Sequence, residues 1–244
     1  GKASLGDLGG DLPPLGVACL ASFLRQHAFG VGILDCCALG LDDDAILEIV
    51  GKKDPRVIGI SSTTYALPRA LELTEKIRAN FPDKLTVLGG AHANVAATES
   101  ADTYPCFDVV AFGADGEYTI LELLQQYAHK GYDRAAFVAD EAALRKIKGA
   151  AFRTRQDVIV NPPRPAIANL DELPLPARDL LPMERYIPLP NQYKRLPVAH
   201  MVVIRGCPYV CSFCDQAGTG GRMRSPQKSI DEVKAKLEDM GLGL

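Results

Sequence analysis

The chain has 244 residues, and its 27 basic side chains nearly balance its 30 acidic ones. This balance gives no electrostatic reason to expect binding to nucleic acid or to an anionic membrane surface. The sequence contains no run of 18 apolar residues and no signal-peptide pattern, so we predict no membrane span. The cysteine count is odd, at seven, and three of them crowd one loop, which predicts a reducing cytoplasm rather than a secreted disulfide framework.

The first 130 residues alternate short apolar runs with segments of helical periodicity. Apolar side chains recur at helical spacing around 17–24, 46–50 and 67–77, more weakly at 94–101, and again from 117 onward. Four short apolar runs, at 31–34, 56–60, 85–88 and 108–112, are typical of buried strands. This alternation predicts an α/β fold with a Rossmann-like, doubly wound parallel sheet that has helices on both faces.

The pattern changes after residue 146. Segments 149–154 and 158–160, separated by three polar residues, predict a β-hairpin, and nine prolines between 161 and 197 predict an irregular linker. The apolar run Val198–Ile204 predicts the first strand of a second domain, and apolar residues from Ile230 to Met240 mark its first helix. We therefore expect a first domain at 1–146, a hairpin and linker at 147–197, and a second domain at 198–244.

Polar or glycine-rich loops follow the expected strands at 35–37, 61–65, 89–92 and 113–117. Ligands of open α/β sheets bind at the carboxyl ends of the strands, hydroxyl groups can donate and accept hydrogen bonds, and glycines allow close backbone approach. The same residue types also cap helices and form tight turns, which is the alternative interpretation. The candidate binding residues are Ser61, Ser62, Thr63, Gly89, Gly90, His92, Gly116 and Glu117.

Three of the seven cysteines crowd one loop. Cys207, Cys211 and Cys214 have C-x3-C-x2-C spacing, and thiolates this close together are typical ligands of an iron–sulfur cluster. Two alternatives stay open: a zinc site with His200 as fourth ligand, and a redox pair at Cys211 and Cys214. The other cysteines lie among apolar neighbours, which predicts no disulfide framework and core positions for Cys19, Cys36, Cys37 and Cys106.

The cysteine spacing, with the aromatic residue Phe213 just before the third cysteine, resembles the signature of radical S-adenosylmethionine (radical SAM) enzymes. Further strings resemble the branch of these enzymes that carries a cobalamin-binding domain, and together they cover nearly the whole chain. They are Pro13-Pro14-Leu15-Gly16, Gly59-Ile60-Ser61-Ser62, Leu88-Gly89-Gly90-Ala91-His92, Gly116-Glu117, and the linker strings at 161–165, 170–174 and 176–182.

The resemblance implies three cofactors. The three cysteines of the loop would hold a four-iron–four-sulfur (4Fe–4S) cluster whose open iron binds S-adenosylmethionine, with Phe213 packed near the adenine. Cobalamin would lie on the first domain, with its nucleotide tail held by the serine and glycine loops. The second domain would then be the first β/α unit of a truncated, TIM-like partial barrel, so we expect a fragment of a longer protein that also lacks the first strand of the sheet.

The implied activity is reductive cleavage of S-adenosylmethionine. It would serve methyl transfer to an unactivated carbon or phosphorus, or a radical rearrangement or cyclisation. The implied partners are a small-molecule or natural-product substrate and an electron donor such as flavodoxin or ferredoxin. The alternative hypothesis is a cobalamin carrier or sensor in which the cysteine loop is only structural.

The chain departs from one common pattern of cobalamin proteins. It contains no D-x-H-x-x-G string, through which some of them bind cobalt by histidine, and Cys37 stands where that histidine would be. His92 is a possible substitute, but we expect cobalamin to bind without a histidine on cobalt. Near the cysteine loop, Arg205, Arg222 and Arg224 could contact an anion or simply be solvated.

Overall fold

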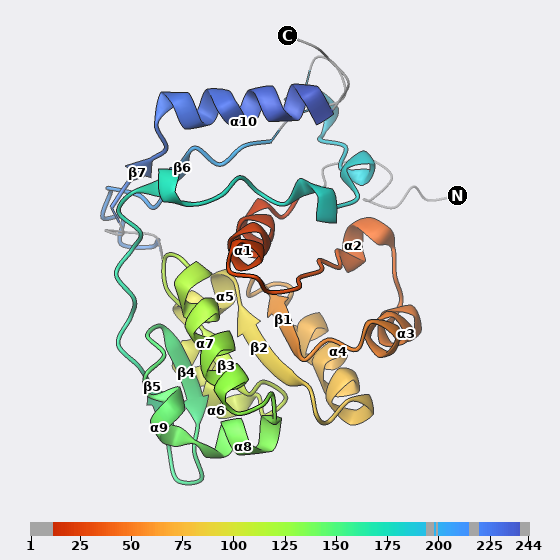
Figure 1. Ribbon diagram of the computed structural model, residues 1–244, viewed down its shortest axis with the longest axis vertical. Helices are drawn as coiled ribbons and strands as arrows, with labels where there is room; N and C mark the ends of the chain where they lie inside the picture. Colours follow the sequence, from red (N-terminus) through yellow and green to blue (C-terminus); the bar gives the residue numbers. More distant parts are fainter. Residues whose placement is uncertain (1–11, 194–197, 199, 215–219, 240–244) are drawn as a thin grey trace. The chain divides into compact units, whose positions relative to one another are not determined.

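The computed structural model describes residues 12–193, 198, 200–214 and 220–239 (Figure 1). The chain divides into two compact units. One comprises Gly1–Leu41, Ala168–Tyr209 and Gly220–Leu244, and the other comprises Asp42–Ile167 and Val210–Thr219. We call them the linker unit and the sheet unit. The domain boundaries expected at 146 and 197 stay predictions.

The sheet unit is built on five strands in the order β1-β2-β3-β4-β5 (Figure 1). The first three strands are parallel, whereas β4 and β5 run antiparallel to their neighbours. The predicted hairpin is therefore confirmed, and it extends the sheet because β4 pairs with β3. The strands are β1 (Val57–Ser61), β2 (Leu85–Gly89), β3 (Val109–Ala111), β4 (Ala150–Arg153) and β5 (Val158–Val160).

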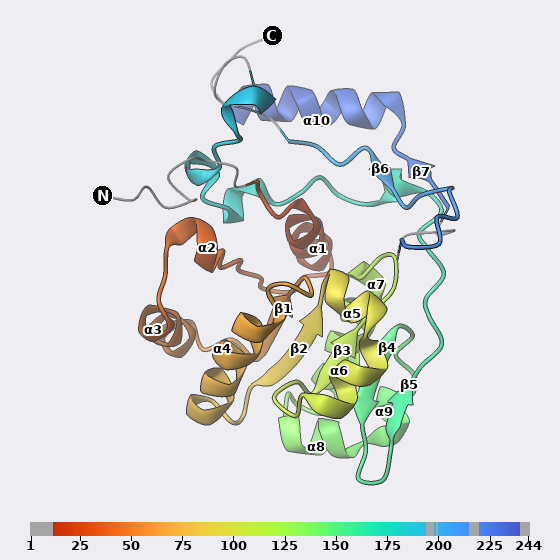
Figure 2. The same cartoon turned by 180° about the vertical axis from the view of Figure 1, so that it is seen from behind.

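Helices cover both faces of this sheet, as Figures 1 and 2 show from opposite sides. One face carries α4 (Leu67–Asn80), α5 (Ala91–Val95) and α6 (Ala97–Thr103), with α3 (Asp43–Lys53) packed against α4. The other carries α7 (Glu117–His129), α8 (Arg134–Ala139) and α9 (Glu141–Leu144). The predicted doubly wound α/β fold is confirmed. The weak helix expected at 94–101 is two short helices, because the backbone leaves helical geometry at Ala96.

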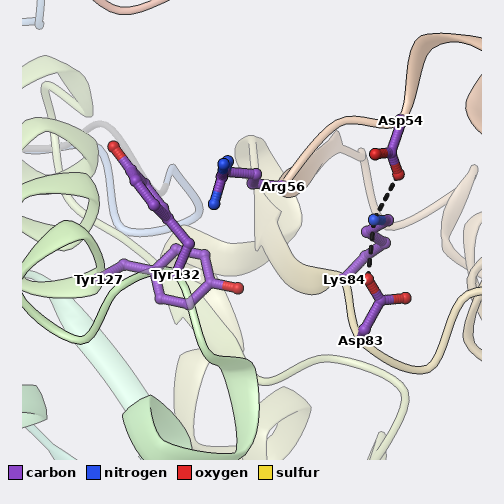
Figure 3. A pocket seen from close by; sticks show the side chains of 6 residues that line it. All are labelled: Asp54, Arg56, Asp83, Lys84, Tyr127 and Tyr132. Carbon is purple, nitrogen blue, oxygen red and sulfur yellow. Dashed lines mark hydrogen bonds and ion pairs between the residues drawn. The ribbon is translucent and has the colours of Figure 1, made fainter.

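A pocket of about 370 Å³ lies at the amino ends of β1 and β2 (Figure 3). The Arg56 guanidinium lies 4.4 Å from the centre of the Tyr132 ring, and Lys84 is paired with two carboxylates at 2.6 and 2.8 Å. These carboxylates raise the pKa of Lys84 by hydrogen bonding. The pocket lies at the sheet edge opposite the one where ligands are expected, and we assign it no role. Its lining residues are Asp54, Arg56, Asp83, Lys84, Tyr127 and Tyr132.

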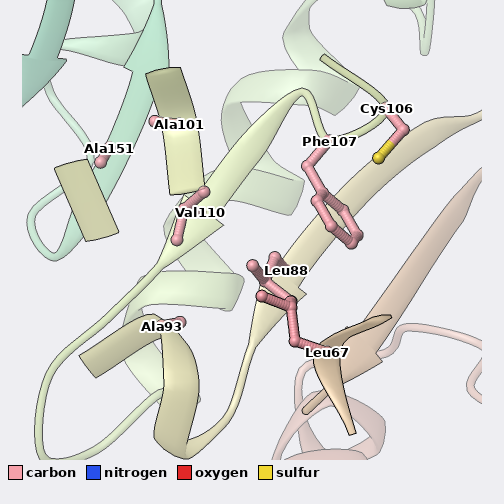
Figure 4. Packing of buried hydrophobic residues seen from close by; sticks show 8 residues of the cluster. All are labelled: Leu67, Leu88, Ala93, Ala101, Cys106, Phe107, Val110 and Ala151. Atoms are coloured by element: carbon pink, nitrogen blue, oxygen red, sulfur yellow. The ribbon is translucent and has the colours of Figure 1, made fainter. Parts of the chain in front are cut away.

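A core cluster fixes α4, α5 and α6 onto the strands (Figure 4). Its largest members are Leu67 at the start of α4, Leu88 in β2 and Phe107 before β3, and small residues complete it. Burying such side chains contributes about 1.5–3 kcal/mol for each large apolar one. This packing fixes the ends of β1, β2 and β3, where the candidate loops begin. The cluster comprises Leu67, Leu88, Ala93, Ala101, Cys106, Phe107, Val110 and Ala151.

The linker unit contains α1 (Leu15–Gln26), α2 (Cys36–Leu39), α10 (Pro226–Asp239) and the paired short strands β6 (Ile204–Arg205) and β7 (Arg222–Met223). The proline-rich linker is irregular, as predicted, and its described part includes the 3₁₀ turns η2 (Leu170–Glu172), η3 (Arg178–Leu180), η4 (Met183–Arg185) and η5 (Pro190–Gln192). Many of its apolar side chains are nevertheless buried, so this segment packs as part of the fold. They are Ile167, Leu170, Leu173, Ala177, Leu181 and Tyr186.

Two strand predictions are wrong. The run 31–34 forms no strand, because no described segment pairs with it, and an apolar run becomes a strand only with a ladder partner. Of the run 198–204 only Ile204 lies in a strand, and residue 199 lies outside the described residues. The helix after the cysteine loop is confirmed as α10, while Met240 lies outside the described part. No helix in the described ranges is long and apolar enough to cross a bilayer.

The scattered cysteines follow the prediction only in part. Cys19 in α1 and Cys106 before β3 are buried, and burial raises the pKa of the Cys106 thiol. Cys36 is half-buried, whereas Cys37 is exposed, so its predicted core position is wrong. The cause is local: Asp35 accepts a hydrogen bond from Ala38 N and starts the four-residue helix α2, in which no residue is buried.

Candidate functional site

The loops after β1 and β2 are hydrogen-bonded to each other at the carboxyl edge of the sheet. Ser62 N donates to Gly89 O at 3.0 Å, and His92 N donates to Ser62 O at 3.0 Å. The Ser62 side chain is buried and donates to Thr63 O, whereas Ser61 and Thr63 are exposed. Only some of the predicted hydroxyls therefore face solvent, and Ser62 instead holds the two loops together. We call these two loops, Ser61–Thr64 and Gly89–His92, the carboxyl rim.

The capping alternative is also partly realised. Thr63 Oγ1 accepts a hydrogen bond from Ala66 N at 3.3 Å, just before α4 begins at Leu67. Next to it, Tyr65 is 96% exposed. It lies in the loop predicted at 61–65 but was not among the candidate binding residues. A tyrosine ring left in solvent at a strand end provides both an apolar face and a hydroxyl to a bound molecule. Its place beside the hydroxyl run was the only sequence signal that could have identified it.

The two glycines of the rim have different physical roles. Gly90 has φ +88°, and a Cβ there would lie 2.7 Å from Ser62 N and 2.8 Å from Ser61 Oγ. Only glycine fits this close approach of the two loops. A Cβ at Gly89 would meet only Ala111 O, at 3.9 Å, which is ordinary contact. Gly90 is therefore required by packing within the protein, whereas Gly89 leaves room that the protein does not fill.

His92 lies inside the rim. The residue is 6% exposed, and its Nδ1 lies 3.1 Å from Thr64 Oγ1. Its Nε2 is buried and has no hydrogen-bond partner among the described residues. The ring is thus buried, and its second nitrogen does not face solvent.

The loop after β3 adds buried carboxylates. Gly113 N donates to Asn94 Oδ1 at 2.9 Å, which ties this loop to α5. Asp115 is buried and accepts a hydrogen bond from Ile167 N at 2.8 Å. Glu117 is 2% exposed at the start of α7, directly after Gly116, where the helix dipole favours negative charge. Asn94 lay inside a predicted helix, so no sequence signal marked it.

The cysteine loop lies between β6 and β7, whose pairing joins Ile204 with Met223 and Arg205 with Arg222. Cys207 and Cys214 are half-buried and Cys211 is exposed, with Cys214 N donating to Cys211 O at 3.2 Å. Phe213 is 91% exposed. Residues 215–219 lie outside the described part of the chain.

Among the residues that the structure describes, no three His, Cys, Asp or Glu side chains are grouped so that they could hold a metal ion. The chemistry of the donor set nevertheless fits an iron–sulfur cluster, because three cysteines lie on one loop and none of them is part of a disulfide. His200, the fourth ligand of the zinc alternative, has a buried Nε2 without a described partner. Burial and the nearby Arg178 lower its pKa. The ligand assignment stays a proposal.

Taken together, these features define an α/β domain with a polar ligand edge at the carboxyl ends of its parallel strands, followed by a packed linker and a cysteine loop. The family model of the B12 binding domain matches residues 1–124, about half of the chain. The chain therefore belongs to this family. The family relationship expected from the sequence is therefore confirmed.

Relatives match almost the whole chain. It is 34% identical to an uncharacterized methyltransferase of Pyrococcus horikoshii, over 94% of this chain and 47% of the relative. It is 29% identical to an anaerobic magnesium-protoporphyrin IX monomethyl ester cyclase of Rubrivivax gelatinosus, over 97% of this chain and 41% of the relative. The chain thus spans less than half the length of these relatives.

A solved structure shares the fold. It is the radical S-adenosylmethionine methyltransferase TsrM of Kitasatospora setae, determined with cobalamin and a 4Fe–4S cluster bound. The TM-score is 0.61 and the identity 18%, over 95% of this chain and 44% of that one. At this identity the likeness supports the fold alone.

Proposed function

We propose that the chain is part of a cobalamin-dependent radical SAM enzyme, in which cobalamin binds at the carboxyl rim and a 4Fe–4S cluster binds at Cys207, Cys211 and Cys214. The main support for this proposal is the carboxyl rim, in which two loops are joined by hydrogen bonds at the ligand edge of a B12 binding domain. In this proposal residues 1–146 bind cobalamin, 147–197 form the hairpin and linker, and 198–244 begin the radical SAM domain.

In this proposal some rim residues contact cobalamin, and others hold the two loops in place. Ser61 and Thr63 are exposed residues whose hydroxyls could hydrogen-bond the polar nucleotide tail of cobalamin, and Gly89 leaves space beside them. Ser62, Gly90 and His92 hold the two loops in place through contacts within the protein. Gly116 and Glu117 would complete the edge at the start of α7.

In the cysteine loop, the three thiolates would hold the cluster, and the exposed ring of Phe213 would pack near the adenine of S-adenosylmethionine. When bound, these cofactors supply reductive cleavage of S-adenosylmethionine and methyl transfer. The electron would come from a donor such as flavodoxin or ferredoxin. Since its relatives include methyltransferases and a cyclase, we propose methyl transfer to an unactivated carbon of a small molecule as the main reaction, with cyclisation or rearrangement as the second candidate.

The product test separates this proposal from a carrier or sensor. Full-length protein with cluster, cobalamin and a reductant is expected to convert S-adenosylmethionine to 5′-deoxyadenosine and S-adenosylhomocysteine, because methyl transfer consumes a second molecule. Liquid chromatography with mass detection measures both. 5′-Deoxyadenosine alone would favour rearrangement or cyclisation. Neither product, with the cluster verified by its iron content, would favour the carrier.

The structure also leads to a prediction about the rim. We expect Gly90→Val to weaken cobalamin binding more than a hundredfold, because its side chain must displace the backbone of Ser62. Gly89→Ala should weaken binding about tenfold with an unchanged melting temperature, because its Cβ disturbs only the ligand. His92→Ala should change binding by less than about threefold. Equilibrium titration of full-length variants with cobalamin measures all three.

The same variants test the cobalt ligand. Because His92 Nε2 is enclosed, we expect the electron paramagnetic resonance lines of Co(II) cobalamin to lack the threefold splitting that a coordinated nitrogen causes. Splitting in the unmodified protein that disappears in His92→Ala would show that His92 binds cobalt and that the rim opens to expose it.

A further inference from the structure

The linker segment 176–186 is held on one side by α1 and α2. Ala177 N donates to Ala18 O at 3.0 Å, inside a small core that Ala18 forms with Leu181 and Tyr186. The Tyr186 hydroxyl donates to Asp35 Oδ2 at 2.7 Å, and Arg25 forms an ion pair with Asp179 at 2.8 Å. These contacts fix segment 176–186 against α1 and the start of α2.

The other side of the same segment is held by a buried ionic cluster. Arg178 donates to Glu232 of α10 and to the carbonyl oxygen of His200, the latter at 2.6 Å. Glu232 is 1% exposed and is also paired with Arg224 at 3.3 Å. Arg224 is itself buried, so its guanidinium is not the solvated group that the sequence left open. We call Arg178, Glu232 and Arg224 the clasp.

The clasp lies at the base of the cysteine loop. Arg224 directly follows β7, and its backbone N–H donates to Val203 O at 2.9 Å, just before β6. Ser225 N donates to Asp171 Oδ1 at 3.0 Å, so the start of α10 is bound to the linker as well. One buried carboxylate therefore joins the linker, the end of the loop and α10.

A buried carboxylate with two arginines is costly to desolvate and is weak evidence for stability alone, because apolar side chains of similar volume usually serve at least as well. An ionic cluster does, however, fix the relative orientation of the segments that carry it, because each guanidinium binds its acceptors in one geometry. The placement of this cluster, where β6 and β7 close the cysteine loop, suggests that its geometry matters to the loop.

We propose that Glu232 and Arg178 are positioning residues for the cysteine loop, and that the linker is the fixed support from which they act. The link to a metal cluster rests on the proposed function. The positioning of the loop base does not. Because Glu232 orients Arg224, and Arg224 closes the loop base, loss of the carboxylate should loosen the segment that presents the three thiolates.

The test compares three variants of the full-length protein. Glu232→Gln removes the charge and keeps the volume, and Glu238→Gln makes the same change at an exposed position of α10. The third variant replaces Arg178, Glu232 and Arg224 together by methionine, which should preserve stability while removing the directed contacts. Amide hydrogen exchange in the 203–225 segment is measured before cluster reconstitution, and the electron paramagnetic resonance spectrum of the reduced cluster, with and without S-adenosylmethionine, is measured after it.

We expect Glu232→Gln and the triple variant to speed exchange at the loop base about tenfold or more and to broaden or shift the cluster spectrum, while Glu238→Gln changes neither. Unchanged exchange in Glu232→Gln, or a triple variant that matches the unmodified protein in both measurements, would overturn the positioning role and leave only packing. A third outcome is faster exchange in Glu232→Gln together with failure of the unmodified protein to bind a cluster at all. It would uphold the positioning of the loop and reject the proposed function.

Discussion

Replacing any one of Cys207, Cys211 and Cys214 by alanine is expected to abolish the iron–sulfur cluster of the full-length protein. Three thiolates are needed to hold three irons of the cube, so the loss of any one leaves an iron without its protein ligand. Iron content and visible absorption after anaerobic reconstitution measure the effect. Near-normal iron in any one variant would contradict the assignment.

The scattered cysteines are the matched controls. Cys36→Ala and Cys37→Ala change thiols of the short helix α2, and Cys19→Ala and Cys106→Ala change buried ones. All four variants should keep the iron content of the unmodified protein. A loss in Cys36→Ala or Cys37→Ala would indicate that α2 contributes a ligand, since neither side chain fills a core position.

Asp108→Ala is expected to destabilise the protein by about 3–5 kcal/mol, because it removes the buried carboxylate that pairs with two half-buried arginines. Asp108 has a side chain 3% exposed and is paired with Arg78 at 2.7 Å and Arg134 at 2.6 Å. It also accepts a hydrogen bond from Thr86 N at 2.9 Å, which joins the starts of β2 and β3. Urea unfolding monitored by circular dichroism measures the loss.

Asp43→Ala is the control for Asp108. Asp43 also contacts two basic residues, but Arg69 and Lys76 are more than half exposed. Water then replaces much of what the ion pair provides, so the loss should be much smaller. Equal losses in the two variants would show that burial of the Asp108 network does not determine its contribution.

Helices and strands could be predicted from the sequence where the local pattern of apolar residues is sufficient to determine the secondary structure. The apolar stripe at 67–77 is α4, and the run at 85–88 is β2. The equally apolar run at 31–34 is not a strand, because a strand also needs a partner that local sequence does not reveal. The hairpin at 150–160 was visible in the sequence, but its pairing with β3 is a tertiary contact and was not.

The candidate site shows the same division. Strand ends located the loops, yet adjacent residues of one type took opposite roles: Ser61 is exposed and Ser62 is buried. Gly89 and Gly90 differ in the same way, because only Gly90 meets the neighbouring loop. Arg178 and Glu232 lie 54 residues apart in the chain, so no local pattern could show that they form one clasp.

Metal analysis of the full-length protein tests the central claim most directly. Protein purified and reconstituted anaerobically with iron, sulfide and cobalamin, then freed of unbound cofactors, should contain about four irons and one cobalt per chain. Cobalt should be retained in Cys211→Ala while iron is lost, because the two cofactors are proposed to use different residues. Cobalt without iron in the unmodified protein would leave a cobalamin carrier, and iron without cobalt would contradict the assignment of the carboxyl rim.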